Sequence, residues 1–287
     1  MTAKSYHMRR FDSIGDFVEA SVKGRKDHCS SSKKGDGWSG SKTYEECVGH
    51  ALHGTWDPGN IKGYSNLFEN LEPNLRTYVE VGFSQGWDVG GYEVDVTRYL
   101  AGEHECMNEF LPAEHQVTKR AICLVIGHSI SAWVSEEELF RKGQAVIALV
   151  RALNLLGFEL EIYSEQTVKS GNERYSVLTR LAAAGDVLDE SAIEYAVGNP
   201  SWLRRLIFGL EEGEPDAIRT TFGFGTGWGG YGQPDGIHHG ELVGADVEIA
   251  LGEAWFDRDT EEEAFDWVVR QLKAVGAIAE DAEVTYS

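Results

Sequence analysis

The chain has 287 residues, a formal net charge of −21 and a hydrophobic fraction of 42%. This length can bury a complete hydrophobic core, in one large domain or in two of ordinary size. The charge disfavours bulk binding to nucleic acid, because affinity for a phosphate backbone comes from neutralising it with Lys and Arg.

The sequence shows no signal for a membrane or for export. No apolar run approaches the roughly 20 residues that a membrane-spanning helix needs, and no apolar stretch of a secretory signal follows the basic residues near the start. The cysteines have no paired-motif spacing; they are Cys29, Cys47, Cys106 and Cys123. Because free thiols are typical of a reducing compartment, we expect a cytoplasmic protein, in the host cytoplasm if a phage encodes it, without membrane contact.

Residues 1–115 are predicted to form an irregular, mostly helical region. Helical patterns cover residues 11–22, 43–53 and 65–71, and Thr43 with Glu46 has the spacing of a capping box. The loop between the first two helices is rich in Ser, Gly and Lys. Trp38 is the aromatic of this loop, and it either anchors the loop on the core or presents a contact surface. Residues 82–102 are rich in glycine and aromatics and are predicted to end in a turn and one helical turn.

The central segment, residues 119–164, has the pattern of a strand, a loop, an amphipathic helix and a second strand. Residues 121–126 form a short apolar run that is typical of a buried strand. Ser135 begins the helix and forms a capping box with Glu138. Residues 158–162 then alternate apolar and acidic side chains, as a half-exposed strand does. Two strands with a crossover helix between them form a βαβ unit, which is right-handed in nearly all cases.

The remaining elements alternate in the same way. Strands are predicted at 174–181, 217–224 and 247–251, and helices at 189–197, 200–210 and 260–275. The last of these helices begins with a further capping box, formed by Thr260 and Glu263. Strands that alternate with helices indicate an α/β fold. For residues 116–287 we therefore predict a three-layer α/β domain, with helices on both faces of one sheet.

The first strand of this domain ends in small and hydroxylated residues, and a long helix and an edge-like strand follow it. This order resembles the opening of a von Willebrand factor A-like domain, and the helix from Thr260 resembles that fold's closing helix. The resemblance implies a Rossmannoid sheet and a divalent cation held by an Asp-x-Ser-x-Ser motif. Gly127, Ser129 and Ser131 occupy the three motif positions, so the carboxylate that Mg²⁺ usually requires is missing. The resemblance thus implies a degenerate motif without metal, whose serines satisfy backbone groups in a turn.

Three short segments carry a second resemblance. They are WSG at 38–40, GYEVDVTRYLAGEHECM at 91–107 and PSWLRRLIF at 200–208. They resemble a family of proteins borne by phages and mobile elements. That resemblance implies such an origin for this chain, but it implies no established activity.

Two strings look like ligand motifs but lack the required context. Residues 225–230 match G-x-G-x-x-G, yet a dinucleotide site needs a helix directly after the glycines, and YGQPDG follows instead. Cys47, His50 and His53 lie three residues apart on one predicted helix. The outer two diverge by about 120°, so all three cannot converge on one zinc ion. We therefore expect no cofactor.

Aromatic and basic residues near the C-terminal end provide candidate protein contacts. Trp228 and Tyr231 lie in a glycine-rich loop, residues 223–236, and are of the types that dominate interface hot spots. The alternative is that both rings pack on the core. Arg204 and Arg205 are placed to hold a carboxylate or phosphate of a partner, or else to pair with an acid of this chain. Trp38 completes the set of predicted contacts.

No catalytic constellation emerges from the sequence. The leading hypothesis is a non-enzymatic protein-interaction or scaffold protein of a phage or mobile element, which contacts a protein partner with the loops at its C-terminal strand ends. A metal-assisted hydrolase or nucleotide-processing enzyme is the alternative, and a virion structural or assembly component is a third possibility. The enzyme would draw its side chains from distant positions: Asp186, Asp189, Asp235, His238, His239 and Asp246.

Overall fold

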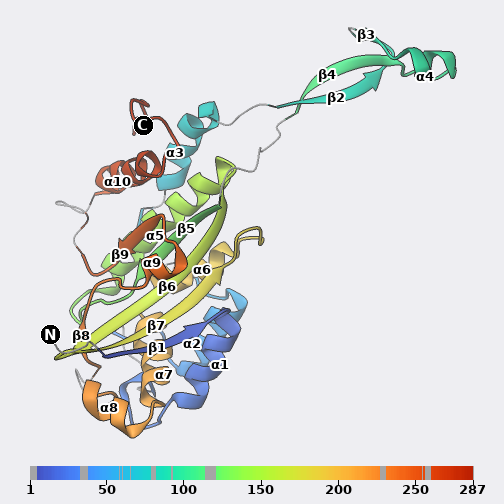
Figure 1. Ribbon diagram of the computed structural model, residues 1–287. Coiled ribbons are helices and arrows are strands. Elements are labelled where there is room, and N and C mark those ends of the chain that lie inside the picture. Colours follow the sequence, from blue (N-terminus) through green and yellow to red (C-terminus); the bar gives the residue numbers. More distant parts are fainter. Residues whose placement is uncertain are drawn as a thin grey trace.

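The structure, a computed structural model, describes residues 5–32, 38–57, 59, 61–64, 66–78, 82–91, 93–113, 121–226, 231–253, 255 and 260–286. The protein is an α/β protein with a central mixed sheet that helices flank, and it has a second, smaller sheet (Figure 1).

The central sheet has the strand order β1-β7-β6-β5-β9. Its strands are β1 (Ser5–Phe11), β7 (Glu173–Ala182), β6 (Glu159–Ser170), β5 (Ala121–Gly127) and β9 (Val247–Ala250), and the short β8 (Gln233–Pro234) pairs with the end of β6. β5 runs parallel to both of its neighbours, whereas β7 is antiparallel to β6, and β1 is parallel to β7. Chain order thus proceeds from β5 to β6 on one side and reaches β9 on the other.

The predicted βαβ unit is present. All residues of β5 after Ala121 are buried. α5 (Glu136–Leu155) begins as predicted, because the Ser135 hydroxyl accepts the backbone N–H of Glu138 at 3.1 Å. β6 is longer than its predicted range, because its polar second half pairs with β7 on one side and with β8 on the other. Pairing on both sides satisfies backbone groups that an apolar pattern alone does not reveal.

Helices account for most of the rest of the chain. They are α1 (Ile14–Gly24), α2 (Tyr44–His53), α3 (Leu67–Leu75), α6 (Glu190–Gly198), α7 (Phe208–Glu212), α8 (Asp216–Phe222), α9 (Gly240–Val243) and α10 (Glu261–Ala274), with short 3₁₀ turns η1 (Ser30–Ser32) and η2 (Arg76–Tyr78) and a π-helix η3 (Trp202–Ile207). The predicted caps at Thr43 and Thr260 each accept a backbone N–H three residues later. Among the residues that the structure describes, no helix combines the length and apolarity that a bilayer crossing requires. All four cysteines are free thiols.

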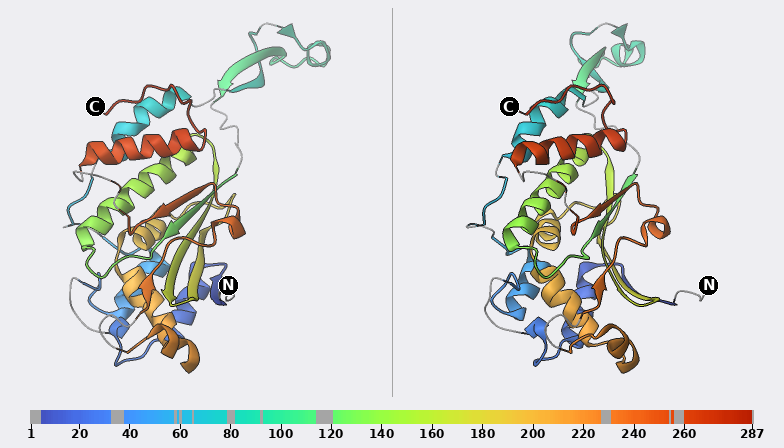
Figure 2. Two further views of the ribbon diagram at one scale, coloured as in Figure 1. Left: turned by 60° about the vertical axis from the view of Figure 1, so that its left-hand side comes forward. Right: turned by 90° about the vertical axis from the view of Figure 1, so that its left-hand side faces the viewer.

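The two faces of the central sheet are covered unequally. Ile122, Leu124 and Ile126 of β5 belong to the main core, which includes buried residues of α1, α3, α5, α6 and α10. Cys123 and Val125 face the other side, where a small cluster lies under the loop that contains α9. Figure 2 shows α5 and α10 on one side of the sheet and α9 on the other. The large core is therefore on the α5 face.

The smaller sheet forms a separate projection. It consists of β2 (Gly82–Asp88), β4 (Met107–Ala113) and β3 (Glu93–Val94) in the order β2-β4-β3, all antiparallel, with α4 (Val96–Leu100) after β3. Figure 1 shows these elements extending away from the central sheet. We call residues 82–113 the arm and the other described residues the body.

Several predicted elements differ from the structure. The strand predicted at 217–224 is wrong, because this segment is helix α8, which ends at Gly223 with the left-handed φ of 76°. The helix predicted at 65–71 continues through Pro73 as α3. The N-terminal region also does not stand apart. β1 pairs with β7, and α1, α2 and α3 contribute side chains to the main core.

Candidate functional site

A cavity of about 230 Å³ lies at the carboxyl-terminal ends of β5 and β6. Its walls come from segments that are far apart in the sequence: Ser30, Trp38, residues 128–132, Gln166, Val168, Leu203, Phe208 and residues 231, 232 and 234. Because β5 is the strand at which chain order diverges to the two sides of the sheet, the cavity lies at the topological switch point. Open α/β sheets place their ligands there.

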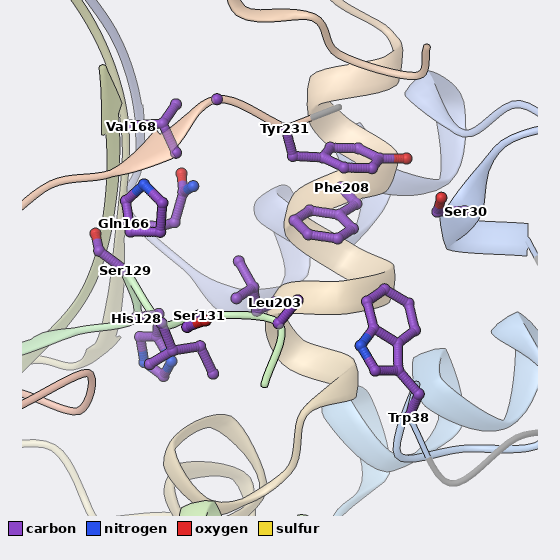
Figure 3. Close-up of a pocket in the computed structure, with 14 residues that line it drawn as sticks. Ser30, Trp38, His128, Ser129, Ser131, Gln166, Val168, Leu203, Phe208 and Tyr231 are labelled. Carbon is purple, nitrogen blue, oxygen red and sulfur yellow. The ribbon is translucent and has the colours of Figure 1, made fainter. Parts of the chain in front are cut away.

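One wall of the cavity is aromatic and apolar. Phe208 and Tyr231 stack face to face with their ring centroids 3.6 Å apart, and Trp38 lies beside Phe208 at 6.4 Å. The Tyr231 hydroxyl donates to Glu212 at 2.6 Å, and this hydrogen bond fixes the orientation of the ring. Leu203, from the π-helix, completes this wall. Figure 3 shows these rings opposite the polar residues of the other wall.

The second wall is polar and begins where β5 ends. The His128 backbone N–H donates to Glu165 at 2.6 Å and extends the pairing of β5 with β6 by one residue. Ser129 continues it with its side chain, because the hydroxyl donates to the Thr167 carbonyl at 2.8 Å and accepts the Thr167 N–H at 2.9 Å. The imidazole of His128 is buried, and burial lowers its pKa to about 3. The wall therefore presents a neutral imidazole at ordinary pH.

Two buried polar atoms of this wall have no partner among the described residues: His128 Nε2 and Gln166 Oε1. Each side chain is only 2% exposed. The Gln166 amide lies against the carboxyl of Glu211, whose pKa is raised well above its usual range by burial and by the nearby Glu212, while Gln166 opposes that shift. Buried acceptors without a partner are uncommon in folded proteins. The Glu211 carboxyl, which its raised pKa keeps protonated, can supply a donor to the Gln166 amide, and His128 Nε2 has none among the described residues.

Arg204 holds the two walls together. Its guanidinium donates to the carbonyl of Trp38 at 2.5 Å and to that of Val134 at 2.9 Å, and it lies 4.9 Å from the Trp38 ring centroid. The loop after β5 and the loop that carries Trp38 are therefore fixed to the same side chain. Arg205 acts behind them, with hydrogen bonds to Ser31, Ser39 and Ser41.

The structure brings together some of the residues that the sequence singled out. Trp38 and Tyr231 line the same cavity, as do Ser129 and Ser131. Tyr231 is packed on the core, which was the alternative to exposure. Trp228 lies outside the described residues.

Arg204 and Arg205 are in the interior and not on a contact surface. The reason is that carbonyl and hydroxyl oxygens from several loops converge on their guanidinium groups.

The three residues of the degenerate motif, Gly127, Ser129 and Ser131, make contacts with other residues of the chain. A Cβ on Gly127 would lie 2.8 Å from a side-chain carbon of Ile237, so an aspartate does not fit at this position without movement of Ile237. Ser129 is committed to Thr167, and Ser131 accepts the backbone N–H of Trp133 at 3.4 Å. These contacts agree with serines that satisfy backbone groups in a turn.

Four of the six residues of the enzyme alternative have structural partners as well. Asp189 caps α6, and Asp246 accepts the backbone N–H of Cys123. Asp235 accepts from Arg174 at 2.7 Å and pairs with His238 at 3.1 Å. Among the described residues, no group of three or more His, Cys, Asp or Glu side chains is arranged to hold a metal ion.

Comparison with known proteins identifies a family. The model of that family, described as Domain of unknown function (DUF7192), matches residues 2–279. The chain belongs to this family. No curated protein and no solved structure matches the chain. Because the match spans both the body and the arm, the cavity and the arm are parts of one DUF7192 unit.

Sequence reasoning missed three features of this DUF7192 site. Gln166 lies in the half of β6 beyond its predicted end, and Phe208 was assigned only to an apolar helix face. Trp133 is 95% exposed in the loop that follows β5. Its position in the loop between the first strand and the helix of the predicted βαβ unit was the signal that could have identified it.

Proposed function

We propose that the protein is a non-enzymatic binding protein whose cavity receives a Trp or Tyr side chain of a protein partner. One observation carries the proposal. The aromatic wall faces a polar wall that carries the Gln166 amide and the Ser129 and Ser131 hydroxyls. Such a pair of walls matches a side chain with an apolar ring and one hydrogen-bond donor.

The size of the cavity favours a single side chain. Sites for cofactors and drug-sized ligands usually measure about 300–1,000 Å³. The cavity here is smaller, at about 230 Å³. Large aromatic side chains that fill a pocket are the usual anchors of protein interfaces.

The chemistry of the walls favours an uncharged occupant. The lining residues that the structure describes include no Lys, Arg, Asp or Glu, and burial keeps His128 neutral. A charged group would lose its hydration here without gaining an ion pair, which is costly. A Tyr hydroxyl or Trp indole N–H of the occupant donates to the Gln166 amide oxygen, and its ring contacts Trp38, Phe208 and Leu203.

Trp133 provides contact area at the rim of the cavity. It follows Ala132, which lines the cavity, and its side chain is almost fully exposed. An exposed aromatic beside a pocket adds apolar area around an inserted anchor, as interfaces often do. The loop at residues 128–134 therefore contributes both a cavity wall and a rim, in keeping with contact by loops at the C-terminal strand ends.

The strand arrangement supports placing this protein with von Willebrand factor A-like domains. β5 lies between the parallel strands β6 and β9, β6 follows the helix after β5, and β7 is antiparallel beyond β6. We also propose that a phage or mobile element encodes this protein. The segments at 38–40, 91–107 and 200–208 support this origin through their resemblance to proteins of such elements.

Small analogues of the two side chains test the cavity directly. Indole and p-cresol represent Trp and Tyr, and 1-methylindole has the same ring system without the donor. We expect indole and p-cresol to bind saturably and to shift the indole NMR signal of Trp38. 1-Methylindole should bind about tenfold or more weakly, because one hydrogen bond contributes about 1 kcal/mol and a buried acceptor left unpaired costs more.

The variant Gln166→Leu provides the matched control, because it removes the acceptor and keeps most of the side-chain volume. In this variant, indole and 1-methylindole should bind equally. Equal binding of the two compounds to the unchanged protein would contradict the assigned role of Gln166. Preferential binding of a charged analogue such as benzoate or benzylamine would contradict the proposed class of occupant.

A further inference from the structure

The arm exposes large apolar side chains at its tip. Leu100 is 78% exposed and Val89 is 72% exposed. The other members of this set are Trp87, Val94, Val96 and Tyr99, and together the six account for nearly half of the exposed large apolar residues that the structure describes. Val96 and Leu100 are four residues apart on α4 and so lie on the same side of it. Exposed apolar groups gathered on one projection are typical of an interaction surface.

The tip is held in shape although its side chains are exposed. Asp95 caps α4 by accepting the backbone N–H groups of Thr97 and Arg98, and its own N–H donates to the carbonyl of Cys106 at 2.7 Å. The Arg98 guanidinium lies 4.2 Å from the ring centroid of Trp87. These contacts connect α4 to the strands on either side. A surface fixed in this way loses little conformational entropy on binding.

The charge of the arm selects among partners. Residues 82–113 contain six Asp and Glu residues, one Arg and no Lys. An acidic surface is repelled by nucleic acid and by anionic lipid. Association of two arms would bring like charges together in a protein whose net charge is −21. The complementary surface is therefore apolar at its centre and basic at its rim.

We propose that the tip of the arm docks into an apolar groove, rimmed by Lys and Arg, on a different protein. This surface is separate from the cavity of the body and uses different chemistry. The cavity takes one uncharged ring, whereas the arm presents several aliphatic and aromatic side chains in a segment with an excess of carboxylates.

The test uses the full chain and a synthetic helical peptide of 18 residues, with leucines along one face and lysines on the other. A second peptide replaces the lysines with glutamates, and a third replaces the leucines with serines. We expect the Leu/Lys peptide to bind saturably by calorimetry. Both other peptides should bind at least about tenfold more weakly, because one lacks complementary charge and the other lacks apolar contact.

Two double variants locate the binding. Val96→Ser with Leu100→Ser should weaken binding of the Leu/Lys peptide at least about tenfold. The matched control is Val22→Ser with Leu52→Ser, which removes exposed apolar residues of similar size from the body and should leave binding unchanged. Gln166→Leu should also leave it unchanged, so failure of the cavity proposal and failure of this one are separate results.

Three outcomes would overturn the proposal. Equal binding by the arm variant and the unchanged protein would place the peptide elsewhere on the acidic surface. Equal binding of the Leu/Glu peptide would remove the charge argument. Concentration-dependent association of the protein alone in sedimentation, abolished by the arm variant, would show that the arm binds a second copy of this chain.

Discussion

The body buries a leucine and an arginine whose counterparts in the arm are exposed or half-exposed. Leu153 of the body is fully buried in the main core, whereas Leu100 of the arm is largely exposed. Arg205 is enclosed by serine hydroxyls and carbonyls, whereas Arg98 lies half-buried over one exposed tryptophan. The body uses both residues for stability. The arm uses its arginine to hold the tip together at the surface and leaves its leucine available for a partner, so sequence composition alone does not separate a structural residue from a contact residue.

Matched substitutions in the two regions turn this comparison into measurements. The first pair has the largest expected difference. Arg205→Met should lower the free energy of unfolding by at least about 3 kcal/mol, because it leaves several buried oxygens without a donor at about 1–3 kcal/mol each. Arg98→Met should cost about 1 kcal/mol or less, since the cation–π contact, the ion pair with Glu103 and the hydrogen bond to the Glu105 carbonyl that it removes are all partly solvated. Urea denaturation followed by circular dichroism measures both values. Similar losses in the two variants would break the comparison.

The second pair consists of two leucines. Leu153→Ala should cost about 2–5 kcal/mol, because it leaves a cavity between α5 and the sheet. Leu100→Ala should change the free energy of unfolding by no more than about 0.5 kcal/mol, since its side chain is in solvent in both states. A loss below about 1 kcal/mol for Leu153→Ala would show that this face of α5 is not the core.

Local signals predicted the parts of the fold that depend on local chemistry. The caps at Thr43, Ser135 and Thr260 were readable because a hydroxyl residue and a glutamate three positions later meet within one helical turn. β1 was missed because its partner β7 lies far along the sequence, and no local pattern records that pairing. The arm was missed because β2 contains two glycines and β4 contains a proline, and both residue types weaken the pattern of a strand.

The candidate site was predictable only in fragments. Trp38 and Tyr231 were noticed as aromatics in polar loops, and Ser129 and Ser131 through the resemblance. Their convergence on one cavity follows from the strand order, which the sequence does not state. Arg204 was misplaced because a buried arginine depends on carbonyls from loops that meet only in the folded protein.

The pH dependence of the free energy of unfolding gives a third comparison, because the body buries a neutral imidazole. The His128 pKa is lowered to about 3 in the folded protein by burial, from a usual value near 6.5. Between these values the unfolded chain binds a proton that the folded protein excludes, so the stability contribution is present above pH 6.5 and is lost as the pH falls toward 3. The free energy of unfolding should fall by up to about 1.4 kcal/mol per pH unit within this window from this group.

The variant His128→Gln tests that assignment. It removes the titrating group and keeps a polar side chain on the cavity wall. Between pH 6 and pH 4, the free energy of unfolding should fall less steeply with falling pH in the variant than in the unchanged protein. Equal slopes in the two proteins would show that His128 is already accessible to protons in the folded state.

The smallest expected difference comes from two glycines. At Gly127, at the end of β5, a Cβ would lie 2.8 Å from Ile237, whereas at Gly90, on the arm, it would meet nothing within 4 Å. Gly127→Ala should therefore cost about 1–3 kcal/mol through overpacking, and Gly90→Ala should be neutral or slightly stabilising, since alanine restricts the unfolded chain. Thermal unfolding of both variants measures the difference. If Gly127→Ala is as stable as Gly90→Ala, the Ile237 side chain moves aside at little energetic cost. The end of β5 then has room for the aspartate that the metal-binding motif requires. Calorimetry with Mg²⁺ on Gly127→Asp would then show whether the two serines of that motif can be released from their backbone contacts to hold an ion.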